Sequence, residues 1–150
     1  MSKCSVMIID DNEADRYILK RHLVKTGIIS QIFEANNGQK AVDLFSEYEK
    51  KRESFPKEFP PMLIFLDINM PLLNGFEFLE KFSAFKKNKD LQAVVVMMFS
   101  TSEKEEEKQK ALNFSFVKDF LSKSNISADL LKEKIRKHCA VFADDQNQES

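Results

Sequence analysis

Residues 62–75 read MLIFLDINMPLLNG, and this stretch decides the fold of the chain. The run from Met62 to Leu66 is short and wholly apolar, which is typical of a strand buried on both faces of a parallel sheet. Asp67 ends the run, and Gly75 precedes a pattern of apolar residues at helical spacing. The stretch therefore predicts a strand, a loop and a helix, in that order.

Similar units lie on both sides of this stretch. Further short apolar runs predict strands at about 6–9, 29–35, 94–99 and 116–121. A helical pattern follows each run: the first places Ile18, Leu19, His22 and Leu23 on one face, and the fourth, at 103–112, is unusually polar. Five such units in a row predict a flavodoxin-like (βα)5 three-layer α/β sandwich, with a five-stranded parallel sheet and right-handed crossovers.

The length of the chain, 150 residues, is that of one ordinary domain. We expect this domain to span residues 1–142 and a polar tail to occupy residues 143–150. Segment 49–61 (EKKRESFPKEFPP) combines charges with three prolines and has no periodicity. We expect it to be a fraying helix end followed by an exposed loop, and not a domain boundary.

Composition narrows the choice of partners and compartment. The 23 basic and 24 acidic side chains nearly cancel, so no overall field steers the chain toward nucleic acid or an anionic membrane. The N-terminus, MSKCSVMIID, is neither a signal peptide nor long enough to span a bilayer. Cys4 and Cys139 form no CxxC pair. We therefore expect a cytoplasmic protein that binds neither nucleic acid nor membranes directly.

Polar residues end the predicted strands, and parallel strands point their carboxyl ends at one rim of the sheet. These residues are Asp10 and Asp11, Asp67, Ser100 and Lys123. Three carboxylates crowded together repel one another and raise their own pKa values unless a cation is present. We expect a small hard cation, Mg²⁺, to offset this repulsion, because it binds carboxylates and keeps several waters.

This set of residues predicts chemistry at phosphorus. With Mg²⁺ and the Lys123 ammonium beside it, the Asp67 carboxylate could attack a phosphorus centre without prohibitive charge repulsion. Ser100 could then donate a hydrogen bond to a phosphoryl oxygen and be drawn toward the site. We therefore predict a nucleophilic aspartate coupled to a conformational switch.

Four segments carry a resemblance to a known family. They are IIDDNEADR, LIFLDINMPLLNGFEFL, VVVMMFSTS and DFLSKS, and they resemble the four signature blocks of response-regulator receiver domains in the expected order. The resemblance spans about residues 5–139. It implies a single-domain response regulator of a two-component or phosphorelay system.

The resemblance implies a role for each matching residue of the phosphorylation site. Asp10 and Asp11 are similar to the acidic pair that orients Mg²⁺, and Asp67 to the phosphoacceptor. Asn69 would give the metal its backbone carbonyl, and Lys123 would bond the phosphoryl group.

Three further positions match the residues that transmit the signal. Ser100 resembles the switch hydroxyl, and Thr101 occupies the next position. Phe120 matches the aromatic residue that moves inward with that hydroxyl. The implied donor is a sensor histidine kinase or a histidine phosphotransfer protein, and the implied output is altered contact with a downstream target protein by a monomer or weak dimer. Apart from self-phosphorylation and slow self-dephosphorylation, no enzyme activity is implied.

Two features depart from the usual family pattern. Proline commonly follows the lysine through a cis bond, whereas Ser124 follows Lys123 here. A cis bond before a residue other than proline costs roughly 3–4 kcal/mol, so the isomer of this bond is left open. The long segment 49–61 resembles the elaborated loop of phytochrome-partner response regulators.

The same residues also fit other interpretations. Asp10 and Asp11 alone would fit a solvated turn, Thr101 rivals Ser100 as the switch hydroxyl, and Phe120 alone would fit the core. A phosphohydrolase of the haloacid dehalogenase type would need a second acid where Asn69 stands. A pseudo-receiver that never takes phosphate disagrees with the full set of acids and lysine.

Overall fold

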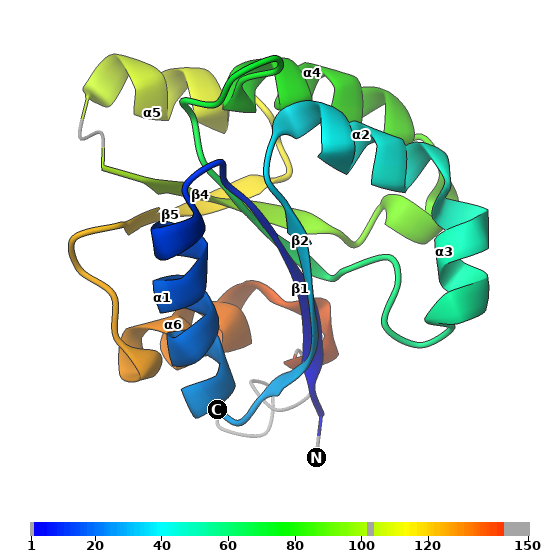
Figure 1. Ribbon diagram of the computed structural model, residues 1–150, viewed down its shortest axis with the longest axis horizontal. Helices are drawn as coiled ribbons and strands as arrows, with labels where there is room; N and C mark the ends of the chain where they lie inside the picture. The colour runs from blue at the N-terminus through cyan, green and yellow to red at the C-terminus, as the bar shows by residue number, and fades with distance from the viewer. Residues whose placement is uncertain (1, 102–103, 143–150) are drawn as a thin grey trace.

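The computed structural model describes residues 2–101 and 104–142. Its strands are β1 (Cys4–Ile9), β2 (Ile29–Ala35), β3 (Leu63–Leu66), β4 (Val95–Ser100) and β5 (Val117–Ser122). They form one sheet in the order β2-β1-β3-β4-β5, and every neighbouring pair is parallel (Figure 1). The predicted flavodoxin-like (βα)5 sandwich is confirmed.

Helices cover both faces of the sheet (Figure 1). The helices α1 (Glu13–Lys25) and α6 (Ala128–His138) pack on one face. The other face carries α2 (Gly38–Ser46), α4 (Gly75–Phe85) and α5 (Glu105–Leu112), with α3 (Tyr48–Ser54) after α2. Short 3-10 turns, η1 (Lys89–Leu91) and η2 (Ala140–Phe142), complete the elements.

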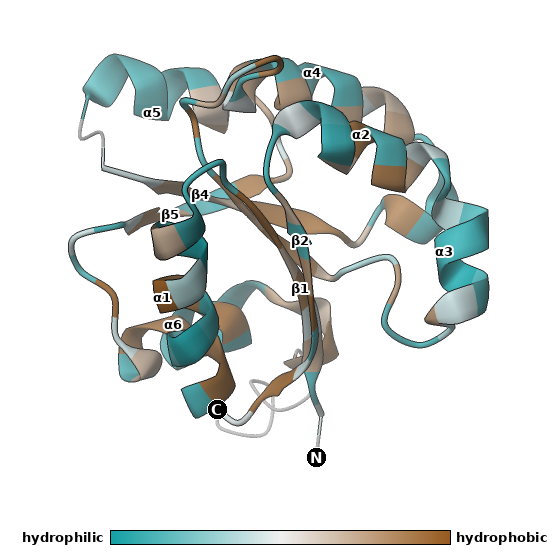
Figure 2. Cartoon of the chain, in the orientation of Figure 1, coloured by the Kyte–Doolittle hydropathy of each residue, from teal (hydrophilic) through white to brown (hydrophobic). Residues whose placement is uncertain are grey.

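The alternation of side chains along each strand builds two cores, one on each face of the sheet. Along β3, Leu63 and Phe65 join the core under α1 and α6, whereas Ile64 and Leu66 join the core under α2 and α4. All four residues are fully buried. Apolar residues therefore follow one another without interruption along this strand, and Figure 2 shows much of the central sheet in brown.

Local polar contacts begin the helices next to the rim. The Asn12 side chain accepts a hydrogen bond from the Asp15 backbone N–H and caps α1. Asn74 and Glu77 form a capping box at the start of α4. These caps set where the chain leaves the loops that follow β1 and β3.

Two expectations about side-chain burial were wrong. Ile18, expected on the inner face of the first helix, is 45% exposed, whereas Leu19 and Leu23 are buried. In segment 49–61 the expected helix end is present as the end of α3, but Phe59, in the loop expected to be exposed, is buried with its ring 5.3 Å from Phe33. The sequence did not reveal this packing, because Phe55 and Phe59, which both contact Phe33, form no periodic pattern in this irregular segment.

The polar helix expected at 103–112 begins at Glu105, and Ala111 is its buried residue. Figure 2 shows α5 mostly teal, consistent with a helix held by few apolar contacts. Glu103 and the predicted tail, residues 143–150, lie outside the described residues. Within the described part of the chain, no helix combines the length and the apolar character needed to cross a bilayer.

Candidate functional site

The carboxyl ends of β1 and β3 bring two acidic residues side by side. Asp10 and Asp67 each follow directly after one of these strands. The Asp67 backbone N–H donates to the Ile9 carbonyl oxygen at 2.9 Å, which continues the β1–β3 pairing to the rim. The Asp10 backbone N–H donates to Ala35 on the other side. The sheet itself therefore holds the two carboxylates in place.

Asp10, Asp11 and Asp67 form one acidic cluster. One carboxylate oxygen from each lies within 4.8 Å of the others. Asp10 is fully buried and Asp67 is 6% exposed, whereas Asp11 faces solvent. Burial and the neighbouring Asp10 carboxylate raise the pKa of Asp67 to about 7, against a smaller lowering by Lys123. The partly buried surroundings therefore disfavour the full negative charge of this cluster.

Lys123, directly after β5, partly neutralises the cluster. Its Nζ lies 2.7 Å from Asp10 Oδ2 and 3.6 Å from Asp67 Oδ1. Burial by itself would lower the pKa of Lys123, but hydrogen bonds to Asp10 and Asp15 outweigh it, so the pKa lies above its ordinary value. The lysine is therefore a charged donor at the rim.

The chemistry of this donor set fits Mg²⁺. Three carboxylates with neighbouring oxygens are the hard ligands that Mg²⁺ prefers, and the raised pKa of Asp67 shows that one ammonium leaves the charge undercompensated. Asn69 lies in the exposed loop after β3, two residues beyond Asp67. A bound dication would supply the missing positive charge.

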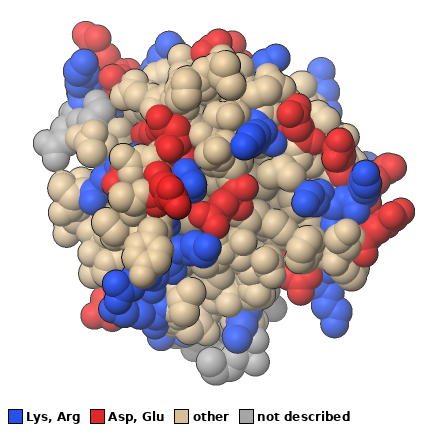
Figure 3. Space-filling view, viewed as in Figure 1, with Lys and Arg blue, Asp and Glu red and all other residues tan. Residues whose placement is uncertain are grey.

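Two residues of α1 belong to the site but were missed from the sequence. The Lys123 ammonium donates to Asp15 Oδ2 at 2.9 Å, and Arg16 Nη1 donates to the Asp10 backbone carbonyl at 2.7 Å. The sequence signal that could have found Asp15 is the helix cap: Asn12 begins α1 directly after Asp10 and Asp11, so Asp15 lies in its first turn. Figure 3 shows acidic and basic groups gathered together around the N-terminal end of α1.

A glycine shapes the loop below Asp67. The Gly75 backbone N–H donates to the Ile68 carbonyl at 2.8 Å. A Cβ at position 75 would collide with the Asp67 carbonyl oxygen and would lie 2.9 Å from Ile68 Cα. Gly75 therefore lets the start of α4 approach the backbone of the acidic cluster.

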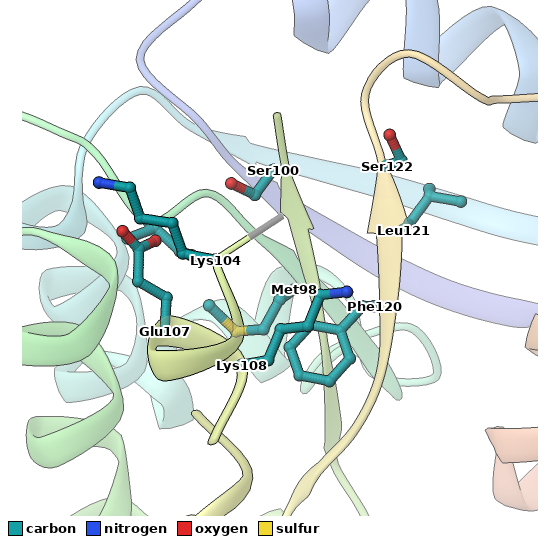
Figure 4. Close-up of a pocket in the computed structure, with 9 residues that line it drawn as sticks. Met98, Ser100, Lys104, Glu107, Lys108, Phe120, Leu121 and Ser122 are labelled. Atoms are coloured by element: carbon teal, nitrogen blue, oxygen red, sulfur yellow. The ribbon is translucent and has the colours of Figure 1, made fainter. Parts of the chain in front are cut away.

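A cavity of about 170 Å³ lies between the end of β4, β5 and α5 (Figure 4). Ser100 and Phe120 line it together with Lys104 and Lys108 of the α5 region. Ser100 is buried, whereas Thr101 is exposed. Phe120 packs half-buried against the core of this face, and its ring lies 6.0 Å from Lys108 Nζ. The cavity leaves room for side chains to rearrange.

The structure decides the isomer of the peptide bond that follows Lys123. The Lys123–Ser124 peptide is trans, and the cis bond within the described residues is Phe59–Pro60. The Lys123 backbone N–H donates to the Ser100 carbonyl at 3.0 Å. This hydrogen bond holds the ends of β4 and β5 together at the rim without a proline after the lysine.

The sequence profile of the response regulator receiver domain matches residues 6–136. The chain belongs to this family. The resemblance predicted from the four segments is confirmed, and the cluster of Asp10, Asp11 and Asp67 is the acidic pocket of a receiver domain. Such a domain is a phosphoacceptor module of two-component signalling.

Three relatives indicate how far the likeness of this receiver domain extends. It is 30% identical to a protein-glutamate methylesterase/protein-glutamine glutaminase of Methanococcus maripaludis over 91% of this chain, but it covers only 34% of that protein. It is 28% identical to Response regulator Rcp1 of Synechocystis, covering 85% of this chain and 81% of Rcp1. The receiver domain of the Arabidopsis thaliana histidine kinase CKI1, crystallised with Mg²⁺ and BeF3⁻, superposes with a TM-score of 0.73 at 25% identity, covering 89% of this chain and 88% of that one.

Proposed function

We propose that residues 1–142 form a response-regulator domain that accepts a phosphoryl group on Asp67 in a Mg²⁺-dependent reaction. The observation that carries this proposal is the position of Asp67. Its carboxylate lies at the open rim of the sheet, beside two further carboxylates and 3.6 Å from the Lys123 ammonium. A carboxylate so placed can act as a nucleophile toward phosphorus once its charge is offset.

Asp10, Asp11 and Asp67 would hold the Mg²⁺ ion, with the Asn69 backbone carbonyl as a further ligand. When bound, the ion offsets the charge of the phosphoryl oxygens. The raised pKa of Asp67 supports this assignment, since a nearby cation would favour the ionised form of this carboxyl. Asp10, fully buried and hydrogen-bonded to the Asn12 backbone N–H, keeps the cluster rigid.

In the proposed reaction, one Asp67 carboxylate oxygen forms a bond to phosphorus as the bond from phosphorus to the donor breaks. The donor would be the phosphorylated histidine of a sensor kinase or phosphotransfer protein, whose imidazole leaves. Lys123 would turn from its aspartate partners toward the new phosphoryl oxygens and pair with them. The CKI1 receiver domain, crystallised as a complex with Mg²⁺ and BeF3⁻, supports a site that accepts a cation together with a phosphoryl-like group.

The signal would leave the site through Ser100 and Phe120. Ser100 donating to a phosphoryl oxygen would draw the end of β4 toward Asp67, with Thr101 as its alternative. Both Ser100 and Phe120 line the cavity beside α5, so this movement would change the space available to the ring (Figure 4). The changed surface of α5 and β5 would then alter contacts with a downstream target protein.

The first test is phosphorylation by acetyl phosphate, measured by intact mass. We expect one added phosphoryl group that requires Mg²⁺ and disappears in Asp67→Asn. Asp43→Asn, which removes an exposed aspartate of α2, is the matched control and should label like the wild type. Undiminished labelling of Asp67→Asn would overturn the proposed acceptor.

The metal assignment has its own test. Titration of Mg²⁺ followed by NMR should shift resonances around Asp10, Asp11 and Asp67 with modest affinity, because few protein ligands and retained waters make a weak site. An unchanged Mg²⁺ response in the Asp10→Asn, Asp11→Asn double variant would contradict it.

A further inference from the structure

The two cysteines of the chain meet at the end of the domain away from the acidic cluster. Cys4 is the first residue of β1, and Cys139 caps the carboxyl end of α6. Their Sγ atoms lie 2.7 Å apart, although 135 positions separate them in the sequence. Both are buried, with 0% and 2% of their surfaces exposed. The fold thus pairs the only two thiols of the chain in one apolar core.

The geometry is close to that of a covalent bond. A disulfide joins its sulfurs at about 2.05 Å, so a shift of less than about 1 Å would bring these atoms to bonding distance. Backbone hydrogen bonds hold both residues: the Cys4 N–H donates to Ile28, and the Cys139 N–H donates to Ile135. Because both partners are anchored, the thiols stay together in the folded state.

The pair is also chemically asymmetric. The hydrogen bond between the two sulfurs, followed by burial, raises the pKa of the Cys4 thiol, whereas the same hydrogen bond lowers the pKa of Cys139. Thiolates are the reactive form of cysteine. Cys139 is therefore the sulfur suited to attack first, with Cys4 placed to resolve the product.

We propose that Cys4 and Cys139 are a modification site that forms an intramolecular disulfide when the protein meets a peroxide. The Cys139 thiolate attacks one peroxide oxygen, giving a sulfenic acid and hydroxide. The Cys4 sulfur then attacks the Cys139 sulfur, the S–S bond forms, and the sulfenic oxygen leaves as water with the thiol proton. Two thiols and one H₂O₂ thus give one disulfide and two waters.

The bond would tie the last helix to the first strand. The closed loop would contain all five strands, and cross-links across long loops restrict the unfolded chain most. Asp67 lies at the opposite end of the strands, roughly 20 Å away along a six-residue strand. Oxidation should therefore raise stability and leave phosphorylation unchanged.

The test uses the full chain, reduced, desalted and treated with H₂O₂ at low protein concentration. Its intact mass should fall by two hydrogen atoms, and both thiols should escape alkylation after denaturation. The Tm should rise on the order of 10 °C, and dithiothreitol should reverse it. Peroxide should cause none of these changes in Cys4→Ser or Cys139→Ser, whereas acetyl phosphate should label both redox forms of the wild type equally.

Two outcomes would overturn the proposal. One is a treated wild type that keeps two alkylatable thiols or only gains oxygen. The other is a disulfide-linked dimer in place of the intramolecular bond. Both are measured on the wild type, so the test holds even where a serine variant folds poorly.

Discussion

The Lys123 ammonium lies 2.7 Å from Asp10 Oδ2 and 2.9 Å from Asp15 Oδ2, both closer than its 3.6 Å distance to Asp67 Oδ1. Before phosphorylation, the lysine is thus bound mainly by carboxylates other than the proposed acceptor. Its ammonium has three N–H donors, so a second donor for a phosphoryl group on Asp67 would have to come from one of these two contacts. Asp15 is the partner easier to leave, because it is partly exposed whereas Asp10 is fully buried.

Asp15→Asn should therefore speed phosphorylation by acetyl phosphate. The substitution removes a competitor for Lys123 and one negative charge near the incoming anion, so we expect a rate increase on the order of threefold. The measurement is the labelling rate by intact mass at saturating Mg²⁺. Glu13→Gln, an exposed acid in the same turn of α1, is the charge-matched control. Equal rate increases in both variants would assign the effect to general charge and not to Lys123.

Without metal, the stability of the domain should fall as pH rises from about 5 to 7. The folded-state pKa of Asp67, about 7, lies above its ordinary value of 3.8. The folded state therefore binds more protons than the unfolded state in this window, and stability is lost by up to about 1.4 kcal/mol per pH unit. Above the folded pKa this contribution levels off.

Urea unfolding in EDTA at several pH values measures this dependence. Subtracting the curve of Asp67→Asn isolates the contribution of this carboxyl from that of every group the two proteins share. Mg²⁺ should stabilise the wild type clearly at pH 8 and little at pH 5, where the proton competes. A wild-type curve parallel to that of Asp67→Asn would refute the raised pKa.

Ser100→Ala should accept phosphate but lose most of the structural response. The variant keeps the acidic cluster and Lys123, yet it removes the hydroxyl that would connect the phosphoryl group to β4. NMR spectra with and without beryllofluoride should differ around Ser100, α5 and Phe120 in the wild type and much less in the variant. If Thr101→Ala loses the response instead, Thr101 is the switch hydroxyl.

Gly75→Ala should destabilise the domain by about 2 kcal/mol, as overpacking against fixed backbone does. The added Cβ would press on the Asp67 carbonyl oxygen and Ile68 Cα, neither of which can move freely. Gly27→Ala is the informative comparison, because its φ of 73° disfavours alanine although no atom lies within 4 Å of the new Cβ. Chemical denaturation gives both costs, and Gly75→Ala alone should also slow labelling of Asp67. Normal labelling in Gly75→Ala would show that the loop tolerates the shift.

The sequence by itself determined the order of strands and helices and the residues at the rim. An uninterrupted apolar run such as residues 63–66 predicts a strand whose two faces are both buried. The carboxyl ends of neighbouring parallel strands lie at the same rim of the sheet. Asp10, Asp67, Ser100 and Lys123 could therefore be placed together without coordinates. Family resemblance supplied the same residues independently.

Only the tertiary structure decided which charged groups pair at the site and which side chains are buried in the core. Contacts of Asp15 with Lys123 and of Cys4 with Cys139 span 108 and 135 positions, and no local pattern encodes such distances. Phe59 is buried in the core although it belongs to an irregular, proline-rich segment. Ile18 is exposed although the helical periodicity predicted that it faces the core. The periodicity of strands and helices depends only on local backbone geometry, whereas these contacts depend on how the five βα units pack against one another.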